Sequence, residues 1–196
     1  MVAMPSDPGF VDSEVTLSFV VGETVSDISR ESQAVDYGVG VWSARLVLPK
    51  MTDAESRPWR AFINSLKGPL NSFDFAFPDR TAPLGTGNGT PLVNGSSQTG
   101  SSIITDGWAN SEVVLKAGDL FQIGDYAYEV ESDVTSDGSG NATITFNPGL
   151  KAAPLDNAAI TTTNVTTKMK LTTNAVGFIT SLVGHTQVSF IIEEKI

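Results

Sequence analysis

The segment from residue 52 to residue 80, TDAESRPWRAFINSLKGPLNSFDFAFPDR, places an amphipathic helix directly before an aromatic strand. Four large apolar side chains recur at the spacing of one helix face: Trp59, Phe62, Ile63 and Leu66. Three aromatic side chains then alternate with smaller or polar ones, as on one face of a strand: Phe73, Phe75 and Phe77. The sequence therefore predicts a helix packed on a sheet, with these seven residues in the shared core.

Two starting points are open for this helix. Thr52 and Glu55 match a capping box, but Pro58 would then lie inside the helix. We expect the helix to begin near Arg57, with Pro58 in its first turn, and to stop at Gly68 after about ten residues.

The rest of the chain is patterned mainly as short strands. Residues 14–21 and 35–48 alternate as strands, and Gly38 and Gly40 predict a bulge or bend in the second. Residues 22–34 are polar and weakly patterned, so we expect an arm or loop that orders against a neighbour. The C-terminal segments 177–182 and 187–192 predict a hairpin that turns around Gly184 and His185.

The middle of the chain predicts a separate module. Residues 81–102 are rich in Gly, Ser, Thr and Asn, which indicates a linker or extended loop. Short strand candidates follow, separated by turn signals: 103–104, 113–115, 120–123, 126–130 and 142–146, with further strand patterning at 159–165 and 168–171. We predict a mainly β protein, in which a split β-barrel or sandwich body with one amphipathic helix, residues 1–85 and 166–196, carries an inserted small all-β module, residues 86–165.

Composition narrows the function classes. The 196 residues include no cysteine and one histidine, His185, which we expect in a solvated turn. Disulfides, thiolate chemistry and a common zinc site are therefore excluded, and we expect neither an enzyme nor a cofactor. The 22 acidic residues exceed the 12 basic ones, for a net charge of −10, which opposes binding to nucleic-acid phosphates. The sequence shows neither a membrane span nor a secretory signal, so we expect synthesis in the cytoplasm.

Several polar or aromatic groups are candidates for a site. Asp133, Thr135 and Asp137 resemble half of a calcium loop, but Ile144 stands where a bidentate Glu is needed, so we expect a hairpin turn. We expect solvated carboxylates at four positions: Asp119, Asp125, Glu193 and Glu194. Three aromatic residues are candidate stacking platforms for a ligand such as a sugar: Trp108, which lies in a predicted loop and is the one tryptophan with a fair chance of exposure, Tyr126 and Tyr128. We expect Trp59 in the core.

Two segments resemble structural proteins of phage tails. The segment WRAFINSLKGPLNSFDFAFPDR looks like tail-associated proteins of long-tailed bacteriophages. The segment LKAGDLFQIGDYAYEVESDVTSDGSGNATITFNPGLKAA resembles a β module that recurs in phage tail and baseplate proteins. Within that group, the chain is most similar to the distal tail proteins of siphovirus-like phages.

The resemblance implies a virion structural protein at the tail tip. Its homohexameric ring would join the tail tube protein to hub or fibre proteins, with a β-barrel belt and an outward module. DNA would pass through the lumen without specific binding, and no membrane would be involved. The alternative is a carbohydrate-binding or host-adhesion module of the tail tip, and an acidic-residue hydrolase ranks last.

Overall fold

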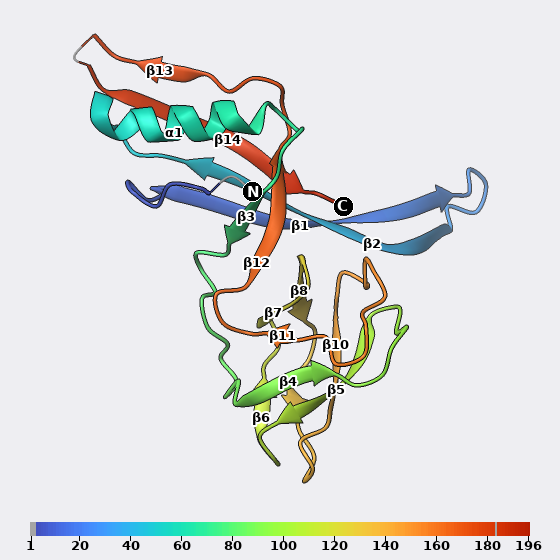
Figure 1. Ribbon diagram of the computed structural model, residues 1–196. Coiled ribbons are helices and arrows are strands. Elements are labelled where there is room, and N and C mark those ends of the chain that lie inside the picture. The colour runs from blue at the N-terminus through green and yellow to red at the C-terminus, as the bar shows by residue number, and fades with distance from the viewer. Residues whose placement is uncertain (1–2, 183) are drawn as a thin grey trace. The chain divides into compact units, whose positions relative to one another are not determined.

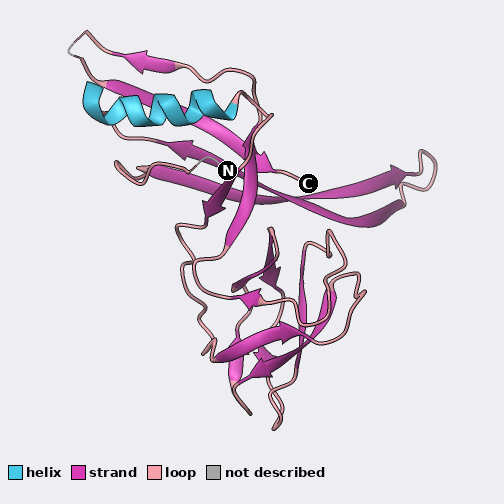
Figure 2. Cartoon of the chain, viewed as in Figure 1, coloured by secondary structure: helices cyan, strands magenta, loops and turns pink. Residues whose placement is uncertain are grey.

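The computed structural model describes residues 3–182 and 184–196. The protein is mainly β, with 46% of its residues in strands and 7% in a helix, and it includes a nearly closed, barrel-like sheet (Figure 1, Figure 2). Contacts divide the chain into two compact units. The first comprises residues 1–17, 42–79 and 166–196, and the second comprises residues 18–41 and 80–165. The mainly β fold class predicted from the sequence is confirmed, whereas the predicted boundaries of independent domains stay a prediction.

The first unit is built on a six-stranded sheet, two of whose strands continue into residues 18–41 of the second unit. Its strands are paired in the order β1-β2-β14-β12-β3, and β13 pairs with β14. Their bounds are β1 Asp12–Val25, β2 Ser32–Val47, β3 Phe73–Ala76, β12 Thr166–Leu171, β13 Phe178–Thr180 and β14 Thr186–Glu194. The C-terminal strand β14 lies beside β2, with Phe190 opposite Leu46. The predicted C-terminal hairpin is therefore present, and it pairs with the N-terminal part of the chain.

The single helix, α1, spans Asp53–Leu66. It begins earlier than we expected, because Thr52 and Glu55 form the complete capping box and satisfy backbone N–H groups of the first turn. Pro58 consequently lies inside the helix, where its missing N–H leaves one intrahelical bond unmade. The expected start near Arg57 is wrong. The helix ends as its sequence predicts, with Lys67 and Gly68 in the left-handed conformation.

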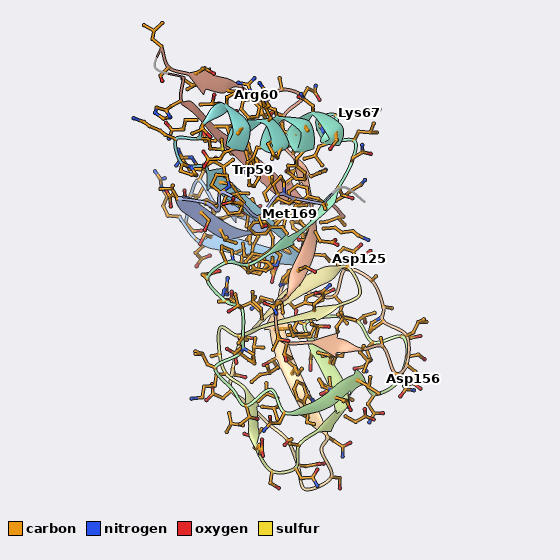
Figure 3. The ribbon with its side chains drawn as sticks, turned by 60° about the vertical axis from the view of Figure 1, so that its left-hand side comes forward. Trp59, Arg60, Lys67, Asp125, Asp156 and Met169 are labelled. Atoms are coloured by element: carbon orange, nitrogen blue, oxygen red, sulfur yellow. The ribbon has the colours of Figure 1, made fainter. Side chains whose placement is uncertain are left out.

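The helix packs on the sheet through aromatic side chains. All seven residues that the sequence assigned to this core are buried. The Phe62 ring lies 5.1 Å from the Phe73 ring and 6.0 Å from the Trp59 ring, both edge to face. Figure 3 shows Trp59 directed from the helix into the unit, whereas Arg60 lies on the outer side. The helix and the aromatic strand therefore form one core.

The second unit is built on another six-stranded sheet. Its order is β11-β7-β8-β10-β5-β4, and β6 pairs with β9 in a small separate sheet. The bounds are β4 Gly89–Val93, β5 Ser102–Trp108, β6 Val113–Leu115, β7 Leu120–Ile123, β8 Tyr126–Val130, β9 Val134–Thr135, β10 Ala142–Asn147 and β11 Ile160–Thr161. A bridge between Leu92 and Ala159 joins the two ends of the larger sheet, so it nearly closes on itself. All five short strands predicted between residues 103 and 146 occur.

The segment 81–102 is more ordered than a linker. It contains β4, whose Val93 is buried, and it packs tightly on β5. A Cβ atom at Gly89 would lie 2.4 Å from the carbonyl oxygen of Gly107, and Gly89 also has a φ of 115°. The glycines that indicated flexibility thus permit the close approach of two backbones. The linker prediction is wrong for residues 89–93, which form β4.

Candidate assembly surface and ligand pocket

Strands β1 and β2 continue well past the sheet that they begin in. Strand β14 pairs with β2 from Ser43 to Val47, whereas β2 itself starts at Ser32. A tight turn joins the two strands, closed by a 2.9 Å hydrogen bond from the Ser26 N–H to the Glu31 carbonyl. We call residues 18–39 of this hairpin the arm. The arm predicted at residues 22–34 is present and exposed, but outside its turn it is formed by paired strands, which the sequence did not predict there.

The arm exposes apolar side chains on both faces. Near the base of the hairpin the strands alternate between buried or half-buried and exposed residues, as in a sheet with one covered face. Along nearly the whole arm this alternation is lost and side chains are exposed. Eight of them are large and apolar: Phe19, Val20, Val21, Val25, Ile28, Val35, Tyr37 and Val39. Ile28, in the turn, is 98% exposed.

An arm of this kind is unfavourable in water, because it leaves large apolar side chains exposed to solvent. A two-stranded ribbon without a covered face is marginally stable, and contiguous apolar surface typically marks an interaction site. Burial of a Val, Ile or Phe side chain contributes about 1.5–3 kcal/mol. Covering the arm would therefore stabilise both the ribbon and a complex.

The three candidate stacking residues have different environments. Trp108 is the last residue of β5 and is only 4% exposed, and its Nε1 donates a 2.8 Å hydrogen bond to the Thr105 Oγ1. Tyr128 is also buried, against Phe121 and Phe146. Trp108 therefore belongs to the core and cannot receive a ligand, so its candidacy as a stacking platform and its predicted loop position are wrong.

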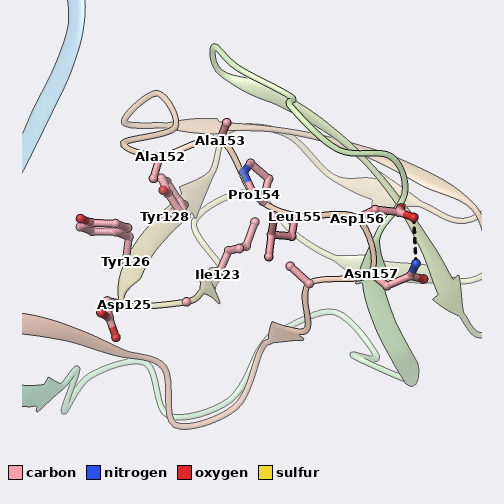
Figure 4. Close-up of a pocket in the computed structure, with 12 residues that line it drawn as sticks. Ile123, Asp125, Tyr126, Tyr128, Ala152, Ala153, Pro154, Leu155, Asp156 and Asn157 are labelled. Carbon is pink, nitrogen blue, oxygen red and sulfur yellow. Dashed lines mark hydrogen bonds between the residues drawn. The ribbon is translucent and has the colours of Figure 1, made fainter.

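Tyr126 and Tyr128 line a pocket of about 440 Å³ in the second unit (Figure 4). The ring of Tyr126 is half-buried, so part of it is accessible. The other wall comes from residues 152–158, with Leu155 highly exposed at the rim. Figure 4 shows apolar side chains in the middle of the pocket, Asp125 at one end, and Asp156 with Asn157 at the other.

Hydrogen bonds fix the end of the pocket that carries Asp156 and Asn157. Asp156 accepts a 2.8 Å bond from the Gly95 N–H through Oδ1 and a 2.9 Å bond from the Asn157 Nδ2 through Oδ2. Asn157 has a φ of 59° and its N–H donates to the Val93 carbonyl. At the Tyr126 end of the pocket, the Lys151 Nζ lies over the aromatic ring, 5.7 Å from its centre. The sequence marked Tyr126 but missed Asp156 and Asn157, whose Asp-Asn pair resembles an ordinary turn.

Two of the four carboxylates expected in solvent are buried. Glu194 accepts bonds from the Trp42 N–H and the Thr167 hydroxyl. Asp119 accepts three backbone bonds, from the N–H groups of Leu84, Gly85 and Lys116. The expectation is wrong for these residues, because each carboxylate replaces water with fixed donors. The sequence does contain a signal for the burial of Glu194, because this residue follows Val188, Phe190 and Ile192 at every second position and so lies on the same strand face.

Asp137 organises a turn. Its carboxylate accepts bonds from the Asn141 side chain and from the backbone N–H groups of Asn141 and Ser139, and these bonds lower its pKa. Asp133 instead accepts a bond from the Ala117 N–H.

Over the described residues, no group of three or more His, Asp or Glu side chains could hold a metal ion. His185 is exposed in the turn between β13 and β14, as we expected.

Other comparisons bear on the class of protein. No helix among the described residues has both the length and the apolar character to cross a membrane. No protein-family model matches the chain, and no curated protein matches it. The arm, the pocket and the charge of the protein are therefore the features that bear on its function.

Proposed function

We propose that this chain is a virion structural protein that forms a ring at the distal end of a bacteriophage tail. The arm carries this proposal, because its exposed apolar side chains on both faces require a partner. A second copy supplies such a partner when the arm of one subunit packs on the next. A contact of this kind is heterologous, and it forms a ring when the rotation from one subunit to the next closes on itself.

The fold and charge support the same role. A mainly β chain with a barrel-like sheet has the fold class that the tail-protein resemblance implies. A net charge of −10 suits a ring whose lumen DNA crosses without binding, because like charges repel. In this proposal the ring joins the tail tube to hub or fibre proteins, has six subunits, and performs no catalysis.

The mass of the purified protein tests the ring. We expect light scattering after size exclusion to give six times the 20.7 kDa of one chain at high protein concentration, and negative-stain microscopy to show annular particles. Mass spectrometry and immunogold labelling of virions would place the protein at the tail tip. A strictly monomeric protein that is absent from virions would contradict the proposal.

A matched pair of variants tests the arm. Val20 on the arm and Ile104 on β5 are 51% and 52% exposed, respectively. We expect Val20→Asp to give folded monomers, since a charge would be buried at the subunit contact. Ile104→Asp introduces the same group at a similar exposure and should leave the ring intact. Equal assembly by both variants would show that the arm is not the contact.

A further inference from the structure

The pocket lined by Tyr126, Asp125, Asp156 and Asn157 has the size of a small-molecule site. Its volume of about 440 Å³ lies within the ~300–1,000 Å³ typical of ligand pockets. Like those pockets, it combines a largely apolar lining with a few polar groups at defined positions. All twelve lining residues belong to the second unit.

The aromatic wall favours a ligand with a flat apolar face. Tyr126 begins β8 and presents a partly accessible ring, next to the buried ring of Tyr128. An aromatic ring offers a rigid apolar surface at a low entropic cost. A sugar ring presents C–H groups on one face and hydroxyl groups at its edge, so it could pack on Tyr126 with its hydroxyls turned to the ends of the pocket.

The polar ends favour a ligand with several hydroxyl groups. Each Asp156 oxygen already accepts one hydrogen bond, from Gly95 or from Asn157, which fixes the carboxylate. A carboxylate oxygen has two acceptor sites, so Asp156 keeps capacity for ligand donors. Asp125 supplies a second carboxylate at the opposite end (Figure 4).

The charges select against ionic ligands. Two carboxylates in the lining disfavour an anion such as a phosphorylated or sialylated sugar. The Lys151 ammonium beside the Tyr126 ring disfavours a cation there. We infer that this pocket binds a neutral saccharide, with Tyr126 packing on the sugar ring and Asp156 and Asp125 accepting hydrogen bonds from its hydroxyl groups. This site is a second function that does not rest on the ring.

A glycan array followed by calorimetry tests the inference on the full chain. We expect the array to show binding to neutral hexose-containing glycans and none to sialylated or phosphorylated ones. The best neutral glycan is then titrated into the wild type and three variants. Tyr126→Leu and Asp156→Asn should each weaken binding about tenfold or more, because they remove the stacking ring and a charged acceptor.

Tyr126→Phe is the matched control, since it keeps the ring and should bind within a few-fold of the wild type. Circular dichroism and thermal unfolding establish that each variant is folded, and Asp156→Asn supplies the test if Tyr126→Leu is not. Three results overturn the inference: no saturable binding of neutral glycans, preference for anionic ones, or unchanged binding in folded Tyr126→Leu and Asp156→Asn. None of them affects the ring proposal, which the mass measurement decides.

Discussion

Glu194 accepts a 3.1 Å hydrogen bond from the backbone N–H of Trp42, a residue 152 positions earlier in the chain. The other oxygen of the same carboxylate accepts a 3.0 Å bond from the Thr167 hydroxyl. One buried side chain on β14 thus connects the two strands that flank it in the sheet, β2 and β12. The sheet of the first unit is held together by a polar contact as well as by its aromatic core.

Glu194→Ala should therefore lower the free energy of unfolding by about 2–3 kcal/mol, because it leaves the buried Trp42 and Thr167 donors without this acceptor. Urea unfolding followed by tryptophan fluorescence measures the change. Glu193→Ala is the control, since Glu193 is only partly buried and forms a 3.2 Å ion pair with Lys170. That pair should contribute less than about 1 kcal/mol. Equal losses in the two variants would contradict the role of Glu194.

Asp119 should be the corresponding polar anchor of the second unit. Its carboxylate accepts N–H bonds of 2.8 Å from Leu84, 3.1 Å from Gly85 and 2.7 Å from Lys116. Asp119→Asn places an NH₂ group against at least one of these donors, so we expect a loss of about 2–3 kcal/mol. Asp133→Asn, at an exposed residue with one backbone bond, should cost less. Thermal unfolding of both variants at neutral pH provides the measurement.

The sequence predicts those parts of the fold that depend on local periodicity. The helix face at Trp59 and the alternation at Phe73 each identify a buried surface without knowledge of the partner. Gly89 shows why the linker prediction failed: composition records conformational freedom, whereas the close approach of Gly107 depends on a strand that lies elsewhere in the sequence. The burial of Asp119 could not be predicted either, because its donors are backbone N–H groups and two of them, of Leu84 and Gly85, are distant in sequence.

The same limit applies to the candidate sites. Trp108 follows a glycine in a polar segment, which indicates exposure, but its strand position turns the indole into the core. The pocket forms only where β8 lies close to the connection at residues 152–158, and no local sequence pattern predicts that proximity. The sequence predicts an arm at residues 22–34, whereas the strand pairing within it depends on residues that no local pattern identifies.

The helix cap should make stability depend on pH. Hydrogen bonds from the backbone N–H and the hydroxyl of Thr52 lower the pKa of Glu55 below its usual 4.5. A lowered pKa stabilises the fold above the ordinary value, and this stabilisation is lost as the pH falls through the folded-state pKa. Glu55→Gln should thus reduce the melting temperature at pH 7, and this effect should shrink as the pH falls through the lowered folded-state pKa of Glu55. Glu14→Gln, on β1, controls for the loss of one charge.

Removal of the cap hydroxyl gives a separate test of the helix start. Thr52→Ala should cost about 1 kcal/mol, because the Glu55 N–H loses its acceptor and the capping box is broken. Thr52→Ser keeps the hydroxyl and should retain most of the stability. Urea unfolding at pH 7 distinguishes the two. If the helix instead began near Arg57, the two variants would be equally stable.

Phe62 provides the most stringent test of the helix-on-sheet core and its link to assembly. Its ring meets Phe73 of the strand and Trp59 of the helix, so Phe62→Ala should cost about 3–5 kcal/mol, and Phe62→Asp should unfold the first unit by burying a charge. Ala61→Asp adds the same residue at the adjacent exposed position and should cost less than about 1 kcal/mol. Circular dichroism and light scattering should show that Phe62→Asp loses the fold and the ring together, whereas Ala61→Asp keeps both. A folded, assembled Phe62→Asp protein would show that this core does not support the ring.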